Sequence, residues 1–224
     1  MNKQALIFVV ISILLFVLIQ DDHWLIGWDL LDLIFLTALL IGIDRKWGAN
    51  YFSGLFIVSL FNRETALFIP LWMFLDAYSK KNRKMIAYSA LLAMIGIVVI
   101  CLLRENLFLG SSQVFEGKQI GMDTTHPIGN YYWLGKNIAS PFNTYPPWKP
   151  GLDLIPAIVI GTIGYFAFQW KSLNATNRNI VILMVAMAAT IFTIAVIHES
   201  RQWLILMPFI IYLIRNENTS TQTD

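Results

Sequence analysis

Two adjacent charged residues interrupt an apolar run in "SLFNRETALFIP", residues 59–70. On a helix Arg63 and Glu64 would point about 100° apart, so they pair poorly with each other and each needs another partner. Pairs of opposite charge also occur at the adjacent positions 104 and 105, and at 199 and 201 with one residue between them. A charge at membrane depth costs roughly 2.5–3.5 kcal/mol on insertion scales, and it persists where it pairs or lines a polar cavity. The pattern therefore predicts either interhelical salt bridges that only hold helices together or a wet cavity whose arginines bind an anion.

Arginine suits the second role because its planar guanidinium binds phosphate oxygens bidentately and stays charged when partly desolvated. A cavity that opens to the outer leaflet would meet phosphate as the head group of a lipid. His126, in "TTHPIGN", could contact such a ligand, and His198 could orient Glu199. The predicted substrate-binding residues are Arg63, Arg104, His126, His198, Glu199 and Arg201.

Three carboxylates are candidates for catalysis: Asp21, Asp22 and Glu64. Asp21 and Asp22 directly follow the first apolar run, where they mark either a solvated loop end or a general base that takes a proton from an acceptor hydroxyl. With His23 they could hold a divalent metal, although a complete site would need Glu64, His126 or Glu199 as well. We expect no metal and no other cofactor.

Composition places these residues in a membrane protein. The chain of 224 residues is 57% hydrophobic, above the 45–50% that is usual for soluble domains. The runs 4–20, 86–103, 154–170 and 180–197 approach or reach the roughly 20 apolar residues that cross a bilayer. The run 4–20 lacks a cleavage pattern and is interpreted as a retained first span. The single cysteine excludes a disulfide framework, and a net charge of +2 is too small to indicate a nucleic-acid partner.

We expect an all-α polytopic bundle of about eight spans. The predicted helices are 4–20, 24–43, 50–62, 65–78, 85–104, 153–170, 180–197 and 201–215. Two short helices would meet near Asn62, which would cap the second one, with Glu64 in its first turn. The alternative is one tilted helix across 50–78. Arg63 and Arg201 each precede a proline by seven residues, and each proline would loosen the helix backbone there.

The distribution of lysine and arginine favours two short helices, because cytoplasmic loops carry the excess of these residues. "DRK" at 44–46 and "SKKNRK" at 79–84 fall on one side only if an even number of crossings separates them. Both termini are then cytoplasmic. The basic residues on that side are Lys3, Arg45, Lys46, Lys80, Lys81, Arg83, Lys84, Lys171, Arg178 and Arg215.

The remaining segments complete one transmembrane domain, residues 1–215. An outer loop over 105–152 would carry a short interfacial amphipathic helix near 129–140, unless it is an ordinary loop with aromatic anchors. Residues 216–224 are predicted to be a disordered polar tail. Asp29 and Asp32 share a face of the second span and must face protein or water.

"FNRETALFIPLWMFL" and "HESRQWLILMPFIIYL" resemble motifs of small bacterial membrane proteins related to the GT-C glycosyltransferase superfamily. The resemblance implies a multi-span enzyme of the bacterial inner membrane that transfers a sugar from a polyprenyl-phosphate carrier at the outer face. It also implies that Asp21 or Asp22 is the base and that Arg63 and Arg201 hold the lipid phosphate.

The first outer loop, of about four residues, is shorter than the superfamily's. A non-catalytic lipid-linked-sugar binder or flippase, or a structural membrane subunit, therefore remains the alternative. The expected partners are the lipid-linked donor and membrane lipids.

Overall fold

The computed structural model describes residues 27–107, 154–194 and 200–220. These residues form helices and contain no strand, which confirms the all-α class for this part of the chain. The elements are α2 (Gly27–Asp44), α3 (Ala49–Leu60), the 3-10 helix η1 (Glu64–Leu67), α4 (Phe68–Ser79), α5 (Arg83–Leu107), α7 (Leu154–Phe168), α8 (Ala175–Ile194), α9 (Ser200–Leu204) and α10 (Met207–Ser220). The helices predicted at 4–20 and 129–140 lie outside the described residues.

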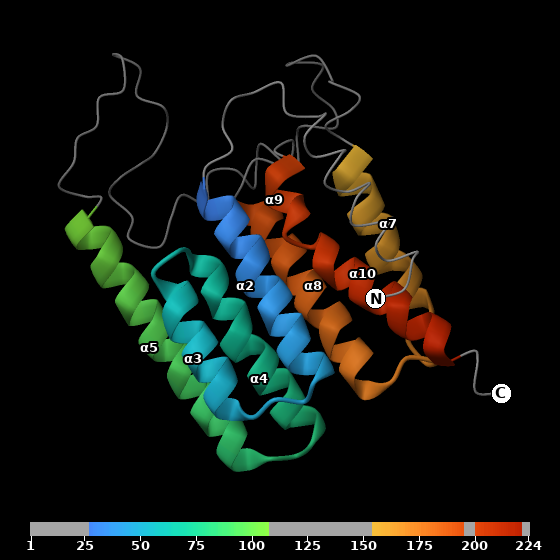
Figure 1. Ribbon diagram of the computed structural model, residues 1–224, viewed down its shortest axis with the longest axis horizontal. Helices are drawn as coiled ribbons and strands as arrows, with labels where there is room; N and C mark the ends of the chain where they lie inside the picture. The colour runs from blue at the N-terminus through green and yellow to red at the C-terminus, as the bar shows by residue number, and fades with distance from the viewer. Residues whose placement is uncertain (1–26, 108–153, 195–199, 221–224) are drawn as a thin grey trace.

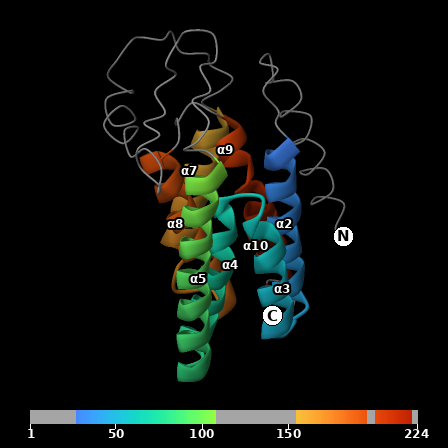
Figure 2. The ribbon, with the colours of Figure 1, turned by 90° about the vertical axis from the view of Figure 1, so that its left-hand side faces the viewer.

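Two short helices, α3 and α4, replace the alternative of a single tilted helix over 50–78. The α2–α3, α3–α4 and α4–α5 pairs run antiparallel as successive hairpins (Figure 1). α4 lies against α3, α5 and α8, so it joins the first hairpins to the second half of the chain. α5 is the left-hand edge of the bundle in Figure 1, and it lies at the front in the view turned by 90° (Figure 2).

Prolines account for two departures from the predicted helix boundaries. The helix expected over 65–78 begins as the 3-10 helix η1, and the one expected over 201–215 is divided into α9 and α10. Pro70 and Pro208 lie in the first turns of α4 and α10. Proline lacks the N–H that an α-helix needs and its ring clashes with the carbonyl four residues earlier, so each proline disfavours a regular α-helix through the turn before it. α10 then continues to Ser220, so residues 216–220, expected to be disordered, are helical.

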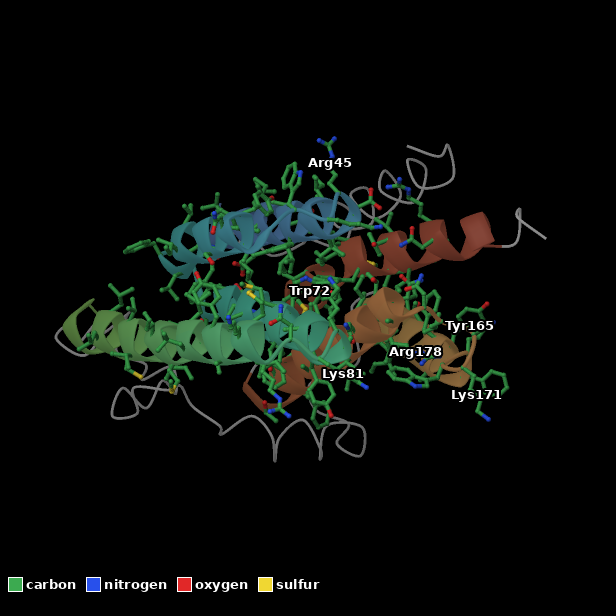
Figure 3. All side chains as sticks on the ribbon, turned by 90° about the horizontal axis from the view of Figure 1, so that it is seen from below. Arg45, Trp72, Lys81, Tyr165, Lys171 and Arg178 are labelled. Carbon is green, nitrogen blue, oxygen red and sulfur yellow. The ribbon has the colours of Figure 1, made fainter. Side chains whose placement is uncertain are left out.

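The interior of the bundle is apolar and rich in large side chains. The largest fully buried ones are Trp203, Phe56, Phe166, Phe209, Leu36, Leu39, Ile69, Ile180, Leu183, Met184 and Met187. Trp72, 3% exposed, lies between the two halves of the bundle when it is viewed from below (Figure 3). These buried side chains form one continuous core through the described helices.

The outer surface is also apolar, most clearly on α5. Its exposed side chains include Leu91, Met94, Ile95, Ile97, Val98 and Leu102. Among the described helices, Arg83–Leu103 and Ala175–Thr193 are long and apolar enough to cross a membrane, and shorter apolar helices span Ala49–Leu60, Ala157–Phe168 and Gln202–Asn216. These two helices are weak support for membrane association, because a core helix of a soluble protein can pass the same test.

Three connections, α2–α3, α4–α5 and α7–α8, lie at one end of the bundle, which we call the basic end (Figure 1). Lys46 and Lys81 hold equivalent positions there, with φ of 54° and 55°, in the left-handed region. In each turn the next residue's N–H bonds to a carbonyl five residues earlier, Trp47 to Gly42 and Asn82 to Ala77, both at 2.9 Å. This pattern is that of a Schellman turn, which ends a helix and reverses the chain.

Candidate functional site

Asp32 is a buried carboxylate in the second turn of α2, and its residue is 2% exposed. Its neighbours Leu31 and Ile34 are 43% and 52% exposed, so Asp32 occupies the inward face of the helix. This placement confirms that Asp32 faces protein. The side chain of Asp29 lies outside the described residues. A carboxylate buried in this way is stable only with hydrogen-bond donors or an opposite charge beside it.

The partners of Asp32 come from one four-residue stretch, Asn62–Thr65, between α3 and α4. The Asn62 side-chain amide donates to Asp32 Oδ1 at 2.7 Å, and the Thr65 hydroxyl donates to the same oxygen at 2.7 Å. Arg63 Nη1 lies 3.8 Å from Asp32 Oδ2. We refer to these four residues, Asp32, Asn62, Arg63 and Thr65, as the Asp32 network. It links the start of α2 to the junction of the next hairpin.

The backbone of the junction explains why these side chains converge. The N–H groups of Asn62 and Arg63 both bond to Ser59 O, at 2.9 and 3.3 Å, and close the end of α3. Arg63 is then extended, with φ −162° and ψ 166°, and its carbonyl accepts from Ala66 N–H at 3.1 Å to begin η1. The chain reverses within a few residues, which turns the side chains on either side of the reversal toward α2.

The prediction that Asn62 caps the second helix is wrong. Arg63 occupies the N-cap position of η1 and no side chain caps it. The Asn62 side-chain nitrogen donates to Asp32 Oδ1 at 2.7 Å, so the side chain is directed to α2 and not to the start of η1. Glu64 does lie in the first turn, where an acid favours the helix dipole.

Close packing against α5 sets the position of η1. A Cβ at Gly96 of α5 would lie 2.6 Å from Phe56 Cζ on α3 and 2.9 Å from Leu67 Cδ2 at the end of η1. Glycine therefore allows the junction to approach the α5 backbone. Phe56 is 1% exposed, so its ring has little room to move.

The network lies partway along the bundle, not at its extreme end. The 12 residues of α3 rise about 18 Å from the basic end at roughly 1.5 Å per residue, whereas the 25 residues of α5 rise about 37 Å. Asp32 precedes the last residue of α2, Asp44, by 12 residues, which is also about 18 Å. The network is therefore at mid-height beside longer helices.

Arg63 is the positively charged member of the network and is partly exposed. Its side chain is 32% exposed, against 2% for that of Asp32. A guanidinium has five N–H donors, and the 3.8 Å contact with Asp32 involves one terminal nitrogen. The arrangement therefore holds a partly exposed positive charge against a buried carboxylate. Asp32 accepts hydrogen bonds from Asn62 and Thr65 at Oδ1 and faces Arg63 through Oδ2, so it can position the guanidinium.

The structure places only part of the predicted site. Arg63 and Glu64 are described with their side chains, and the backbones of Arg104 and Arg201 lie in α5 and α9. The starts of α2, α7 and α9, the α3–α4 junction and the end of α5 all lie toward the end opposite the basic end (Figure 1). The predicted site residues outside the described part are Asp21, Asp22, His126, His198 and Glu199.

Within the described residues, no group of three or more His, Cys, Asp or Glu side chains is arranged to hold a metal ion. The three histidines at 23, 126 and 198 are not among those residues. The ligands considered for a metal, apart from Glu64, therefore remain a prediction from sequence.

Asp32 is the functional candidate that sequence analysis did not connect to Arg63. The signal was present, since an acid inside an apolar helix requires a partner. Its partner is 31 positions away, however, and Arg104, Glu105, Glu199 and Arg201 offered other pairings. The contact depends on how the two hairpins pack.

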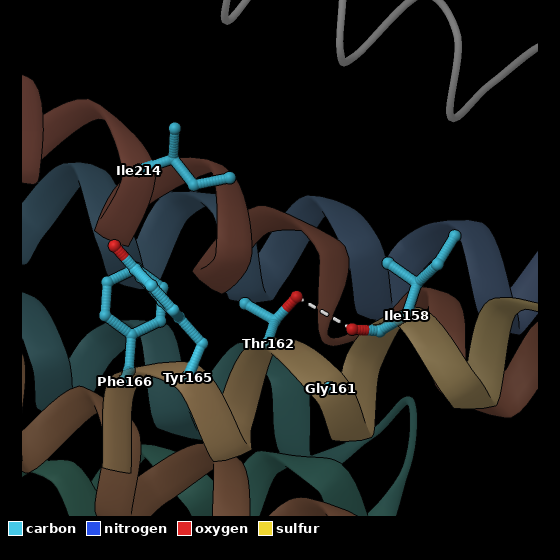
Figure 4. A pocket seen from close by; sticks show the side chains of 6 residues that line it. All are labelled: Ile158, Gly161, Thr162, Tyr165, Phe166 and Ile214. Atoms are coloured by element: carbon cyan, nitrogen blue, oxygen red, sulfur yellow. Dashed lines mark hydrogen bonds between the residues drawn. The ribbon is translucent and has the colours of Figure 1, made fainter. Parts of the chain in front are cut away.

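A hollow of roughly 380 Å³ lies elsewhere, between α7 and α10 (Figure 4). It is lined by Ile158, Gly161, Thr162, Tyr165, Phe166 and Ile214. The Thr162 hydroxyl donates to Ile158 O at 2.7 Å within its own helix. The lining is mostly apolar, and none of it belongs to the Asp32 network.

No family model, curated protein or solved structure matches this chain. What the structure defines is a class of architecture, an all-helical bundle in which a short helical hairpin carries an arginine paired with a buried aspartate.

Proposed function

We propose that this chain is an integral protein of the bacterial inner membrane with about eight spans and cytoplasmic termini. Two described helices have the length and composition of membrane spans. Lysines and arginines gather in the connections at the basic end, as expected for the cytoplasmic side. With 4–20 as a first span, the successive helices return both termini to that side. In a bilayer whose hydrocarbon core is about 30 Å thick, the Asp32 network would lie below the outer surface of that hydrocarbon core.

The function proposed is that of a GT-C-like glycosyltransferase that uses a polyprenyl-phosphate-linked sugar at the outer face. One observation supports it most: the Arg63 guanidinium is held by a buried acid and is one-third exposed at mid-height. A lipid phosphate that enters from the outer leaflet would reach such a group. Maintaining a charge there is costly unless it serves a polar ligand or a second helix.

The chemistry proposed is transfer of the sugar to an acceptor hydroxyl. Asp21 or Asp22 would take the hydroxyl proton while the oxygen forms a bond to the anomeric carbon. The bond from that carbon to the phosphate oxygen would break, and polyprenyl phosphate would leave with its charge balanced by Arg63. Arg104 and Arg201 would contribute further positive charge, and His126, His198 and Glu199 would contact the sugar or orient neighbours. Glu64 is the remaining carboxylate candidate.

A non-catalytic lipid-linked-sugar binder or flippase would use Arg63 in the same way and would need no base. The structural role, in which the charges only fix helix packing, is favoured by another observation. Asp32 receives donors from Asn62 and Thr65 as well as the charge of Arg63, which is what a helix-locking contact requires.

A charge-neutral double variant, Asp32→Asn with Arg63→Gln, distinguishes binding from packing. It removes both charges and keeps polar groups at both positions, so the bundle should remain folded. Native mass spectrometry with added polyprenyl phosphate should show bound lipid for the wild-type protein and at least a tenfold loss for the double variant. Equal retention of the lipid by a folded double variant would show that Arg63 serves packing alone.

The catalytic step has a separate readout in membranes. Asp21→Asn and Asp22→Asn should leave protein level and lipid binding unchanged, and one of them should abolish sugar transfer. Normal transfer by both variants would count decisively against the general base and would leave the binder or flippase as the function.

A further inference from the structure

A second hollow lies at the basic end, on the opposite side of the proposed membrane from the donor site. It has a volume of roughly 340 Å³ and is lined by Tyr78, Lys81, Arg83 and Ile86. Tyr78 ends α4, Lys81 lies in the turn and the other two begin α5. The hollow is therefore lined by two cationic side chains, one phenol hydroxyl and one apolar side chain.

The cations of this hollow are available to a ligand. The nearby acid, Asp76, is engaged by Lys80, whose Nζ lies 2.7 Å from Asp76 Oδ2. Lys81 and Arg83 have no ion-pair partner among the residues that the structure describes. The left-handed backbone of Lys81, with φ 55°, fixes where its side chain leaves the turn. The described part of the chain thus leaves the charge of Lys81 and Arg83 without an acidic partner.

The apolar surface above the hollow continues along α5. Ile86, Ala90, Ala93 and Ile97 follow at spacings of 4, 3 and 4 residues, which places them on one face. Ala90 and Ile97 are exposed, and the two alanines leave that face shallow. On α4, the Phe74 ring stacks on that of Tyr78 with centroids 6.3 Å apart and planes 12° apart. A hydrocarbon chain could lie against this surface.

Aromatic side chains place the hollow at the level of the head groups. Trp47, Tyr78 and Trp170 lie at or beside the three connections of the basic end, and they are 40%, 69% and 37% exposed. Trp and Tyr favour the interface between hydrocarbon and water. In Figure 3, Lys81 lies at the rim of this end, on a different side from Arg45.

We infer that this hollow binds the phosphate group of an anionic phospholipid from the leaflet at the basic end. Lys81, Arg83 and the Tyr78 hydroxyl bind the phosphate, and one acyl chain lies along Ile86, Ala90 and Ile97. The occupant is a lipid because the cations adjoin an exposed apolar helix face; a free phosphate would leave that face unused. This inference rests on the proposed membrane insertion and is independent of sugar transfer.

The test uses the purified full-length protein in detergent micelles, titrated with phosphatidylglycerol and with phosphatidylcholine. Native mass spectrometry counts the bound lipid. Lys81→Gln with Arg83→Gln should weaken phosphatidylglycerol binding about 25-fold, since each cation near an anionic lipid contributes about fivefold. Phosphatidylcholine binding should be weaker in the wild-type protein and should change little in the variant.

The α2–α3 turn offers a matched control, Arg45→Gln with Lys46→Gln. It also removes one arginine and one lysine from the basic end, and Lys46 has the same left-handed conformation as Lys81. Arg45 lies over the Trp47 ring, 5.6 Å from its centroid. Phosphatidylglycerol binding should fall less than threefold. Equal losses in the two double variants would show diffuse attraction and overturn the site.

Two further results separate the alternatives. Displacement of the lipid by millimolar inorganic phosphate would show a free-anion site and overturn the lipid assignment. Extraction of the wild-type protein from membranes by alkaline carbonate would contradict the proposed membrane insertion itself. Protein that resists extraction, yet binds phosphatidylglycerol regardless of Lys81 and Arg83, contradicts only the present inference.

Discussion

At the scale of single residues, the charge of Asp32 is made tolerable by one short stretch of chain. Asn62 and Thr65 donate to one carboxylate oxygen, while Arg63 faces the other. Arg63 is thereby held in place, and its guanidinium remains one-third exposed. The same group of residues both stabilises a buried acid and presents a cation. Variants that change one of these two functions at a time are therefore needed to separate them.

Thr65→Val isolates the neutral part of the network. Valine has nearly the shape of threonine and removes only the hydroxyl that donates to Asp32. We expect the free energy of unfolding to fall by about 1–2 kcal/mol, because a buried carboxylate loses one donor. Reversible unfolding in mixed detergent micelles measures the change.

Thr193→Val is the matched control. The Thr193 hydroxyl bonds only to Ala189 O and Thr190 O within α8, at 2.9 and 3.0 Å. Its loss should alter stability by less than about 0.5 kcal/mol. If both threonine variants lowered the free energy of unfolding equally little, the hydrogen bond from Thr65 to Asp32 would not contribute significantly to stability.

At the scale of elements, the α3–α4 hairpin depends on its contact with α5. Basic residues on both sides of the hairpin favoured two short helices over one tilted helix, and α3 and α4 are two short helices. The charge pattern says nothing about how closely the hairpin approaches its neighbour. Gly96 decides that, because its missing side chain leaves room for Phe56 and Leu67.

Gly96→Ala should therefore destabilise the bundle. The new methyl group would overlap the buried Phe56 ring, and overpacking of this kind costs about 1–3 kcal/mol. Leu67 of η1 packs against the same glycine, so the substitution should also shift η1 and weaken the binding of polyprenyl phosphate at Arg63. Unfolding in mixed micelles and native mass spectrometry with polyprenyl phosphate measure the two effects.

Gly54→Ala serves as the comparison in the same hairpin. A Cβ there meets nothing within 4 Å, so the change should leave binding intact and stabilise α3 by about 0.5–1 kcal/mol through helix propensity. Should Gly96→Ala behave in the same way, close packing at α5 would not position the junction.

At the scale of the whole molecule, the separation of charge between the two ends predicts topology. In a Cys101→Ser background, single cysteines at Lys46, Lys81 and Lys171 should all react with a membrane-impermeant maleimide only after cells are opened. A single cysteine at Ser112, in the connection between α5 and α7, should react with the same maleimide in intact cells. Labelling yield by mass spectrometry measures both. Reaction of Lys46→Cys and Lys171→Cys from opposite sides would refute the arrangement.

The sequence by itself determined the helical class, the short hairpin at residues 50–78 and the grouping of basic connections at one end. These properties follow from composition, apolar run length and charge order along the chain, which are local or nearly local. The change from 3-10 to α-helix at Phe68 and the break before α10 are local as well, since Pro70 and Pro208 disfavour a regular α-helix through the preceding turn. The cap predicted at Asn62 failed because Arg63 takes the N-cap position of η1, and the Asn62 side chain donates to Asp32 on another helix.

Only the tertiary structure decided which acid faces Arg63. Asp32 and Arg63 are far apart in the chain, and several charged residues were equally plausible partners before the hairpins were packed. The contact exists because α2 and the α3–α4 junction both place their polar groups about 18 Å from the basic end, and because Gly96 lets the junction settle against α5. Pairing between distant residues depends on packing in three dimensions, which neither periodicity nor charge order encodes.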